Sequence, residues 1–159
     1  MVKTQTSATR ASLCALLDDA RRELLASFHG LADEQMELPL PDGWSVKDIL
    51  AHVAMWDEME LPDMRRAARG SVRVLDGLDE DESLVDRWNE VQFRLRRRLP
   101  VKQVLTELSG ERASIIEFLQ SVPEECLTSG FIPTACAVQA RHDRDHAQQI
   151  REWRQTQGI

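Results

Sequence analysis

The sequence has no tyrosine and few other aromatic residues. Phenylalanine and tryptophan make up about 5% of its 159 residues, and there are only seven glycines and six prolines. Aromatic residues favour strands, while Gly and Pro build the many turns that connect them. Their scarcity argues against a sheet-rich protein and favours an all-α fold.

Cysteine and long apolar runs are scarce as well. The three cysteines, Cys14, Cys126 and Cys136, show no CxxC spacing, so neither a disulfide framework nor a zinc ribbon is predicted. Cys126 and Cys136 flank a predicted loop, where each is either a small buried side chain or an exposed nucleophile. No stretch approaches the ~18 apolar residues that span a membrane, and the N-terminus lacks the apolar core of a signal peptide. We expect a soluble, cytoplasmic protein with no membrane partner.

Basic residues are fewer than acidic residues. Twenty Lys and Arg against twenty-seven Asp and Glu give a net charge of −7. Proteins that bind nucleic acid usually present an excess of basic residues to the phosphates, so the balance predicts no nucleic-acid partner. With 42% hydrophobic and 30% charged residues, the chain has enough apolar material for a packed core. We expect one domain over residues 1–159.

Apolar residues recur at helical spacing along most of the chain. The predicted helices cover 7–28, 45–69, a segment between the acidic run 79–82 and Arg98, 100–122, and 135–155, separated by loops at 38–44, 71–81 and 123–135. Ser45, followed by Asp48, resembles a capping box at one helix start. The third helix is predicted to bury Leu84, Trp88, Val91 and Leu95. The pattern predicts an antiparallel four-helix bundle with an additional shorter helix.

Three histidines fall on faces that are predicted to point inward. His142 and His146 lie four residues apart, on the same stripe as Val138, Ile150 and Trp153. His52 borders the buried face of the helix over 45–69. Imidazole is a poor core group unless both of its nitrogens are satisfied. The residues alone leave two interpretations open, namely hydrogen-bonded histidines on a partly wet face and ligands that share a metal ion.

Two segments carry a family resemblance. WSVKDILAHVAMWDE at 44–58 and ARHDRDHAQQIREWR at 140–154 resemble the signature segments of the DinB-like superfamily of helical-bundle proteins. In that pattern a Trp and a capping residue open one helix, a His follows about two turns later, and an H-x-x-x-H motif lies on the final helix. The resemblance implies a four-helix bundle with a divalent metal ion bound by His52, His142 and His146.

The same resemblance implies a chemistry. Similar proteins include bacillithiol S-transferases and mycothiol-dependent maleylpyruvate isomerase, in which a low-molecular-weight thiol is the cosubstrate. Three neutral imidazoles leave coordination positions of Zn²⁺ or Ni²⁺ open, so the ion could activate a thiol or water for attack on an electrophilic small molecule, in detoxification or a stress response. The alternatives are a non-catalytic protein that binds a metal or small molecule, and a metal-free hydrolase. Such proteins often pair through bundle helices, which implies a homodimer.

Polar neighbours of the histidines are candidates for supporting roles. A hydrogen-bonding partner normally fixes the orientation of a ligating histidine, and Gln149 is better placed for this than Asp143 or Asp145. Asp57 and Glu58 lie about one turn beyond the first histidine. They either reach an open coordination position or are exposed helix charges.

Overall fold

The computed structural model describes residues 8–71 and 82–159, which form helices joined by short connections. The elements are α1 (Arg10–Phe28), α2 (Asp33–Met36), α3 (Val46–Ala68), α4 (Glu82–Arg96), α5 (Val101–Ser121), the 3-10 turn η1 (Glu124–Leu127) and α6 (Phe131–Gln157). In these two ranges the one β contact is an isolated bridge between Pro39 and Ser45. The all-α prediction is confirmed.

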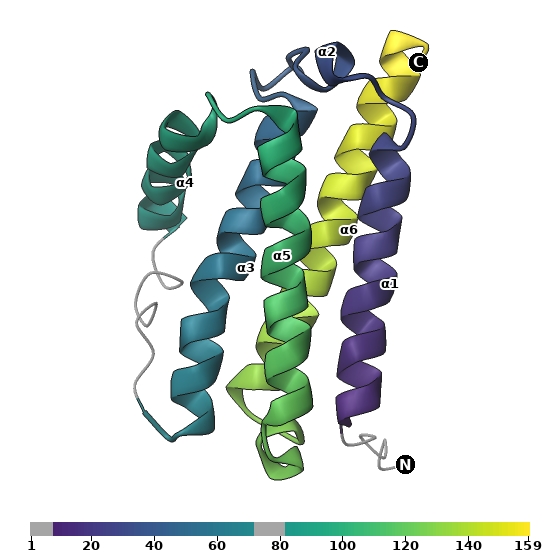
Figure 1. Cartoon of the computed structure of the whole chain (residues 1–159). Coiled ribbons are helices and arrows are strands. Elements are labelled where there is room, and N and C mark those ends of the chain that lie inside the picture. Colours follow the sequence, from purple (N-terminus) through teal and green to yellow (C-terminus); the bar gives the residue numbers. More distant parts are fainter. Residues whose placement is uncertain (1–7, 72–81) are drawn as a thin grey trace, which may run out of the picture.

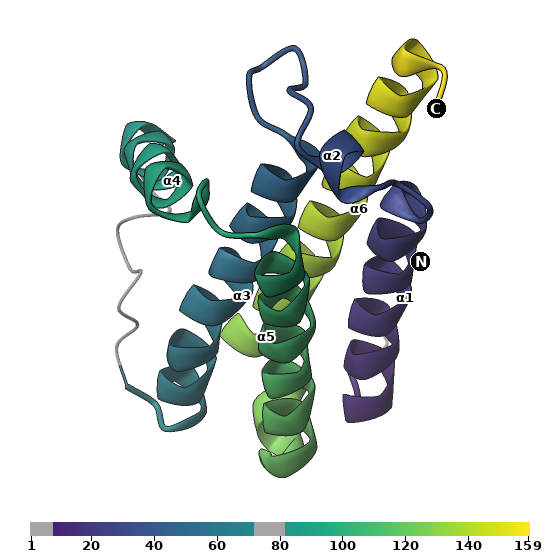
Figure 2. The ribbon, with the colours of Figure 1, turned by 45° about the horizontal axis from the view of Figure 1, so that its top comes forward.

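Four long helices, α1, α3, α5 and α6, form the bundle (Figure 1). α1 and α6 lie side by side and run in one direction, while α3 and α5 lie side by side and run in the opposite direction. α4 lies outside this bundle and packs chiefly on α3 (Figure 2). The predicted four-helix bundle with an additional shorter helix is therefore confirmed, with α4 as the additional helix.

Helix α3 begins at the capping box that the sequence predicts. The hydroxyl of Ser45 accepts a hydrogen bond from the backbone N–H of Asp48 at 3.1 Å, and the Asp48 carboxylate accepts one from the backbone N–H of Ser45 at 2.9 Å. α1 begins after its N-cap Thr9, later than the predicted start at residue 7, which lies outside the described residues. The predicted loop over 71–81 also lies outside them, except for its first residue.

Helix α6 begins earlier than predicted. Its first residue is Phe131 rather than Ala135, so Pro133 lies in the first turn. Backbone N–H groups in a first turn have no partner within the helix, so a proline there costs no hydrogen bond. The loop predicted over 123–135 is therefore shorter and contains η1. The four-residue helix α2 was not predicted.

The apolar stripe predicted for α3 is buried, whereas three of the four residues predicted for α4 are exposed and the fourth, Trp88, is half-buried. Val46, Ile49 and Val53 are fully buried between the bundle helices. By contrast, Leu84 and Leu95 of α4 are 40% and 67% exposed, and Val91 of the same stripe is 49% exposed. Because α4 lies outside the bundle, it turns the neighbouring face toward α3 and leaves these three side chains in solvent. Among the described residues, no helix is long and apolar enough to cross a membrane.

A buried group of four charges joins the four bundle helices. Arg21 of α1 contacts Asp57 of α3 and Asp143 of α6, each at 2.8 Å. Arg112 of α5 contacts the same two carboxylates at 3.0 and 3.3 Å. The carboxylates are fully buried and each arginine is less than 10% exposed. Each carboxylate thus faces two guanidinium groups, so no member of this Arg–Asp network is buried without an opposite charge.

Candidate metal centre

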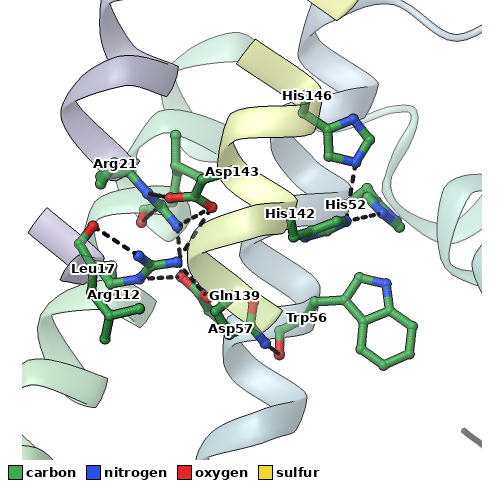
Figure 3. A network of polar contacts seen from close by, with 11 residues as sticks. Leu17, Arg21, His52, Trp56, Asp57, Arg112, Gln139, His142, Asp143 and His146 are labelled. Atoms are coloured by element: carbon green, nitrogen blue, oxygen red, sulfur yellow. Dashed lines mark hydrogen bonds and ion pairs between the residues drawn. The ribbon is translucent and has the colours of Figure 1, made fainter. Parts of the chain in front are cut away.

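The structure brings together the three histidines that the sequence singles out. His52 comes from α3, and His142 and His146 come from α6 (Figure 3). The Nε2 atom of His142 lies 2.9 Å from Nε2 of His52 and 3.0 Å from Nε2 of His146. One nitrogen of each ring can be chosen so that all three lie within 4.8 Å of one another. The helices therefore converge three imidazole nitrogens on one point.

Burial keeps these imidazoles neutral. Burial, together with the neighbouring histidines, lowers the pKa of His142 to about 2 and that of His52 to about 3. Burial also lowers the pKa of His146, although the Gln149 side chain and nearby carboxylates act in the opposite direction. At neutral pH each ring therefore keeps one nitrogen with a free lone pair, which is the form that binds metals.

Hydrogen bonds identify the free nitrogen of His146. Gln149 donates from Nε2 to the carboxylate of Asp42 at 2.9 Å, which turns its oxygen Oε1 toward Nδ1 of His146, also at 2.9 Å. An amide oxygen only accepts, so Nδ1 of His146 carries the proton. A neutral imidazole has one N–H group, so Nε2 of His146 presents its lone pair to the other two histidines. Gln149, the predicted supporting residue, thus contacts a candidate ligand.

The three rings cannot satisfy one another by hydrogen bonding. Nε2 of His142 faces two ring nitrogens but holds at most one proton, which can point to only one of them. Nδ1 of His52 is buried and has no hydrogen-bond partner among the residues that the structure describes. Nitrogen lone pairs gathered about 3 Å apart repel one another unless a cation lies between them. This donor set therefore fits a divalent ion that prefers imidazole ligands.

Aromatic side chains enclose His52 and attach α4 to the site. The ring of Trp44 lies edge-on to His52, with centroids 5.2 Å apart, and stacks on Phe93 of α4 at 5.1 Å. The ring of Trp56 also lies edge-on to His52, with centroids 6.4 Å apart, and its Nε1 donates to the side chain of Asn89 of α4 at 3.1 Å. Phe93 and Asn89 were missed in the sequence because their role depends on which face α4 turns inward.

A pocket of about 880 Å³ opens beside the cluster. His52 and His142 form part of its wall, with apolar side chains from three helices and a few polar groups. The other lining residues are Trp56, Glu60, Val85, Asn89, Gly130, Phe131, Thr134, Ala135, Val138, Gln139, Arg141 and Asp145. Val138 was predicted to be buried with the histidines, but it is 46% exposed because α6 presents this side to the pocket.

The acidic residues after His52 do not reach the cluster. Asp57 was predicted either to approach the metal or to be exposed, and both interpretations are wrong because it belongs to the buried Arg–Asp network. In Figure 3 this network and the histidines lie on either side of α6. Glu58 is an exposed helix charge, and its carboxylate pairs with Arg96 at 2.6 Å.

The cysteines are poor candidates for a nucleophile. Cys136 is fully buried, and burial raises the pKa of its thiol to about 12, so its thiolate is not available at neutral pH. Cys126 is half-buried, and its thiol lies 3.8 Å from the carbonyl oxygen of Ala68. Neither is among the described residues that line the pocket.

Solved structures with the same fold have little sequence identity to this chain. An uncharacterised protein from Escherichia coli UTI89 has a TM-score of 0.79 at 12% identity over 99% of both chains. The Sibling Lethal Factor Precursor DfsB has a TM-score of 0.79 at 13% identity, over 94% of this chain and 96% of its own. The colibactin self-resistance protein ClbS has a TM-score of 0.76 at 11% identity, over 92% and 96%. No curated protein matches the chain.

One of these structures corrects a prediction. ClbS is described in complex with double-stranded DNA. A protein with this fold can therefore bind DNA, and the exclusion of nucleic-acid partners on the basis of net charge was wrong.

A comparison of the sequence with family models agrees with the fold and with the family that the two signature segments resemble. The family model described as the DinB superfamily matches residues 16–150, which run from the first turns of α1 to the last turns of α6. This range contains all three clustered histidines. The chain belongs to the DinB superfamily.

Proposed function

We propose that the protein is a divalent-metal-dependent enzyme. His52, His142 and His146 hold the ion, and a small thiol or water attacks an electrophilic substrate in the adjoining pocket. The observation that carries this proposal is the convergence of three neutral imidazole nitrogens at the wall of an 880 Å³ pocket. When bound, a divalent ion lowers the pKa of a thiol or water so that the nucleophilic anion forms near neutral pH.

The pocket favours a substrate with an apolar body. Its volume lies within the range of roughly 300–1,000 Å³ that is typical of small-molecule sites. Trp56, Phe131 and Val138 offer apolar surface, and Arg141 and Asp145 add charge at exposed positions. Gln139 is 3% exposed, and its Oε1 has no hydrogen-bond partner within residues 8–71 and 82–159. An unpaired buried acceptor is costly, so this amide favours a substrate that donates a hydrogen bond.

The choice of ion is supported by the ligand chemistry of imidazole, and the choice of nucleophile by the family resemblance. Imidazole suits both Zn²⁺ and Ni²⁺, which makes these the candidate ions. A low-molecular-weight thiol is the proposed cosubstrate because thiol transferases are among the proteins that the signature segments resemble. Cys136 cannot replace it as a nucleophile, because its thiol is buried and protonated.

Metal content tests the proposal directly. We expect about one Zn²⁺ or Ni²⁺ per chain by elemental analysis of the purified protein, and a fall to background in His142→Ala. His29→Ala is the matched control, because His29 is an exposed histidine at the end of α1. A parent protein that binds neither ion after reconstitution contradicts the proposal.

A reaction panel then separates an enzyme from the alternatives. Thiols are combined with electrophiles such as epoxides and activated aryl halides, and product formation should stop with a chelator and return with the ion. Tight ligand binding without turnover favours a binding protein, and full activity after chelation favours a metal-free hydrolase. Duplex DNA belongs in the binding panel because ClbS is described in complex with it.

A further inference from the structure

The turn between α2 and α3 has a conformation fixed by its own sequence. The backbone N–H of Gly43 donates to the carbonyl of Leu40 at 2.9 Å, and the N–H of Leu40 donates to the carbonyl of Trp44 at 2.6 Å. Gly43 has φ +88°, a left-handed conformation that glycine adopts without strain. Pro41 restricts φ at the preceding corner of the turn. The Pro-Asp-Gly sequence thus sets where the side chain of Asp42 lies.

Asp42 makes a separate contact with each of its carboxylate oxygens. Oδ2 accepts a hydrogen bond from Nε2 of Gln149 at 2.9 Å, and Oδ1 accepts one from the backbone N–H of Trp44 at 3.0 Å. Gln149 is the partner of His146, and the Trp44 ring lies edge-on to His52. The Asp42 carboxylate therefore contacts Gln149, which lies beside His146 of α6, and Trp44, which lies beside His52 of α3.

We propose that Asp42 is a positioning residue of the candidate metal centre. It fixes the amide orientation of Gln149, and through it the proton on Nδ1 of His146, and it holds Trp44 against His52. A carboxylate only accepts, so Gln149 must direct its NH2 group to Asp42 and its oxygen to His146. If the amide turned over, its NH2 group would face Nδ1 and favour the Nε2–H tautomer, which takes the lone pair of His146 away from the cluster.

The effect of Asp42 on metal affinity rests on the proposed function. The tautomer of His146 does not, because it is a property of the metal-free protein. Histidines that bind metals normally donate their second ring nitrogen to such a partner, and loss of the partner lowers metal affinity by about 10–100-fold. Asp42 is exposed and acts through Gln149. We therefore place its effect at the lower end of that range, at about tenfold.

The tautomer of His146 is the first measurement. Asp42→Asn keeps the size of the side chain but has one oxygen and one NH2 group, so it cannot accept from both Gln149 and Trp44. Long-range ¹H–¹⁵N NMR spectra of the chelator-treated full chain, above neutral pH, should show Nδ1–H for His146 in the parent. They should show a substantial Nε2–H population in Asp42→Asn. The matched control is Asp33→Asn, which removes an exposed carboxylate from α2 and should keep the parent tautomer.

Metal affinity is the second measurement, made by competition with a chromophoric chelator for Zn²⁺ and for Ni²⁺. Asp42→Asn should weaken binding by about tenfold, while the urea midpoint of the metal-free protein stays unchanged. Gln149→Leu removes the amide through which Asp42 acts on His146. In that background Asp42→Asn should cost less than about threefold, because coupled residues do not contribute additively.

The outcomes separate the two proposals. A His146 tautomer that is the same in the parent, Asp42→Asn and Gln149→Leu overturns the positioning role, as do equal losses of affinity for Asp42→Asn and Asp33→Asn. A parent that binds no metal overturns the proposed function. The tautomer measurement still decides the role of Asp42 in that case.

Discussion

The ionisation of two half-buried histidines gives the protein a dependence on pH. In the unfolded chain a histidine titrates near pH 6.5, whereas burial lowers the pKa of His52 to about 3 and that of His142 to about 2. Between these values the unfolded chain binds more protons than the folded one, so the free energy of unfolding falls as pH falls. The expected slope is up to about 1.4 kcal/mol per pH unit for each of the two histidines.

Urea unfolding of metal-free protein between about pH 7 and pH 5 measures this slope. His142→Gln should reduce it, because glutamine does not titrate, while His29→Gln should leave it unchanged. Equal slopes in the parent and in His142→Gln would show that burial does not keep His142 neutral.

The sequence located the histidines but not everything that supports them. His142 and His146 were paired by their helical spacing, and His52 was grouped with them because it borders a predicted buried face. The resemblance of two segments then favoured a shared metal ion. Gln149 lies three residues from His146 and was within reach of the same reasoning. Asp42 lies 107 residues before Gln149, so only the folded chain shows their hydrogen bond.

The face that α4 turns toward the bundle could not be predicted from hydrophobic periodicity. One stripe holds Leu84, Trp88, Val91 and Leu95, and a neighbouring face holds Val85 and Phe93, so the sequence offers two apolar faces. Periodicity identifies a helix, but a choice between two such faces depends on what lies beside it. The second face turns toward α3 and the residues just before it: Phe93 stacks on Trp44, and Asn89 accepts a hydrogen bond from Trp56 of α3.

Substitutions on the exposed stripe of α4 should be tolerated. Leu95 is 67% exposed, so Leu95→Lys is expected to change the free energy of unfolding by less than about 0.5 kcal/mol. Leu119 of α5 is fully buried, and Leu119→Ala should cost about 2–5 kcal/mol. Chemical denaturation of both variants provides the comparison. Similar losses for the two would contradict the placement of α4 outside the bundle.

The Arg–Asp network couples the bundle helices more strongly than exposed pairs do. Arg112→Met leaves Asp57 and Asp143 with only one guanidinium, which should cost about 3–5 kcal/mol of stability. Arg144→Met breaks the exposed pair with Glu23, which also joins two helices, and should cost less than about 1 kcal/mol. Urea unfolding distinguishes the two, and a small loss in Arg112→Met would refute a structural role for the network.

For the whole molecule, ion binding and stability should be linked. An ion that binds only the folded chain raises the free energy of unfolding by about 2.7 kcal/mol at a hundred times its dissociation constant. Thermal unfolding with Zn²⁺ or Ni²⁺ should therefore show a higher Tm in the parent and in His29→Ala, but not in His142→Ala. A rise that persists in His142→Ala would place the binding elsewhere.

The net charge of the molecule gives a misleading picture of its surface. The total of −7 predicts no nucleic-acid partner, and the DNA complex of ClbS contradicts that prediction for this fold. Charge is not evenly spread, because four arginines fall within residues 94–98, and three of them are exposed. Phosphate groups respond to such local clusters, so a sum over the chain was the wrong quantity to judge by.

The buried network also bears on how the chain folds and unfolds. Its ion pairs join residues 31 to 122 positions apart, and each of the four long helices supplies one member. A partly assembled bundle that lacks one helix leaves a charge in an apolar interior without its full set of partners. Intermediates of this kind are penalised, so the bundle should assemble and melt as one cooperative unit, with no stable three-helix species on the way.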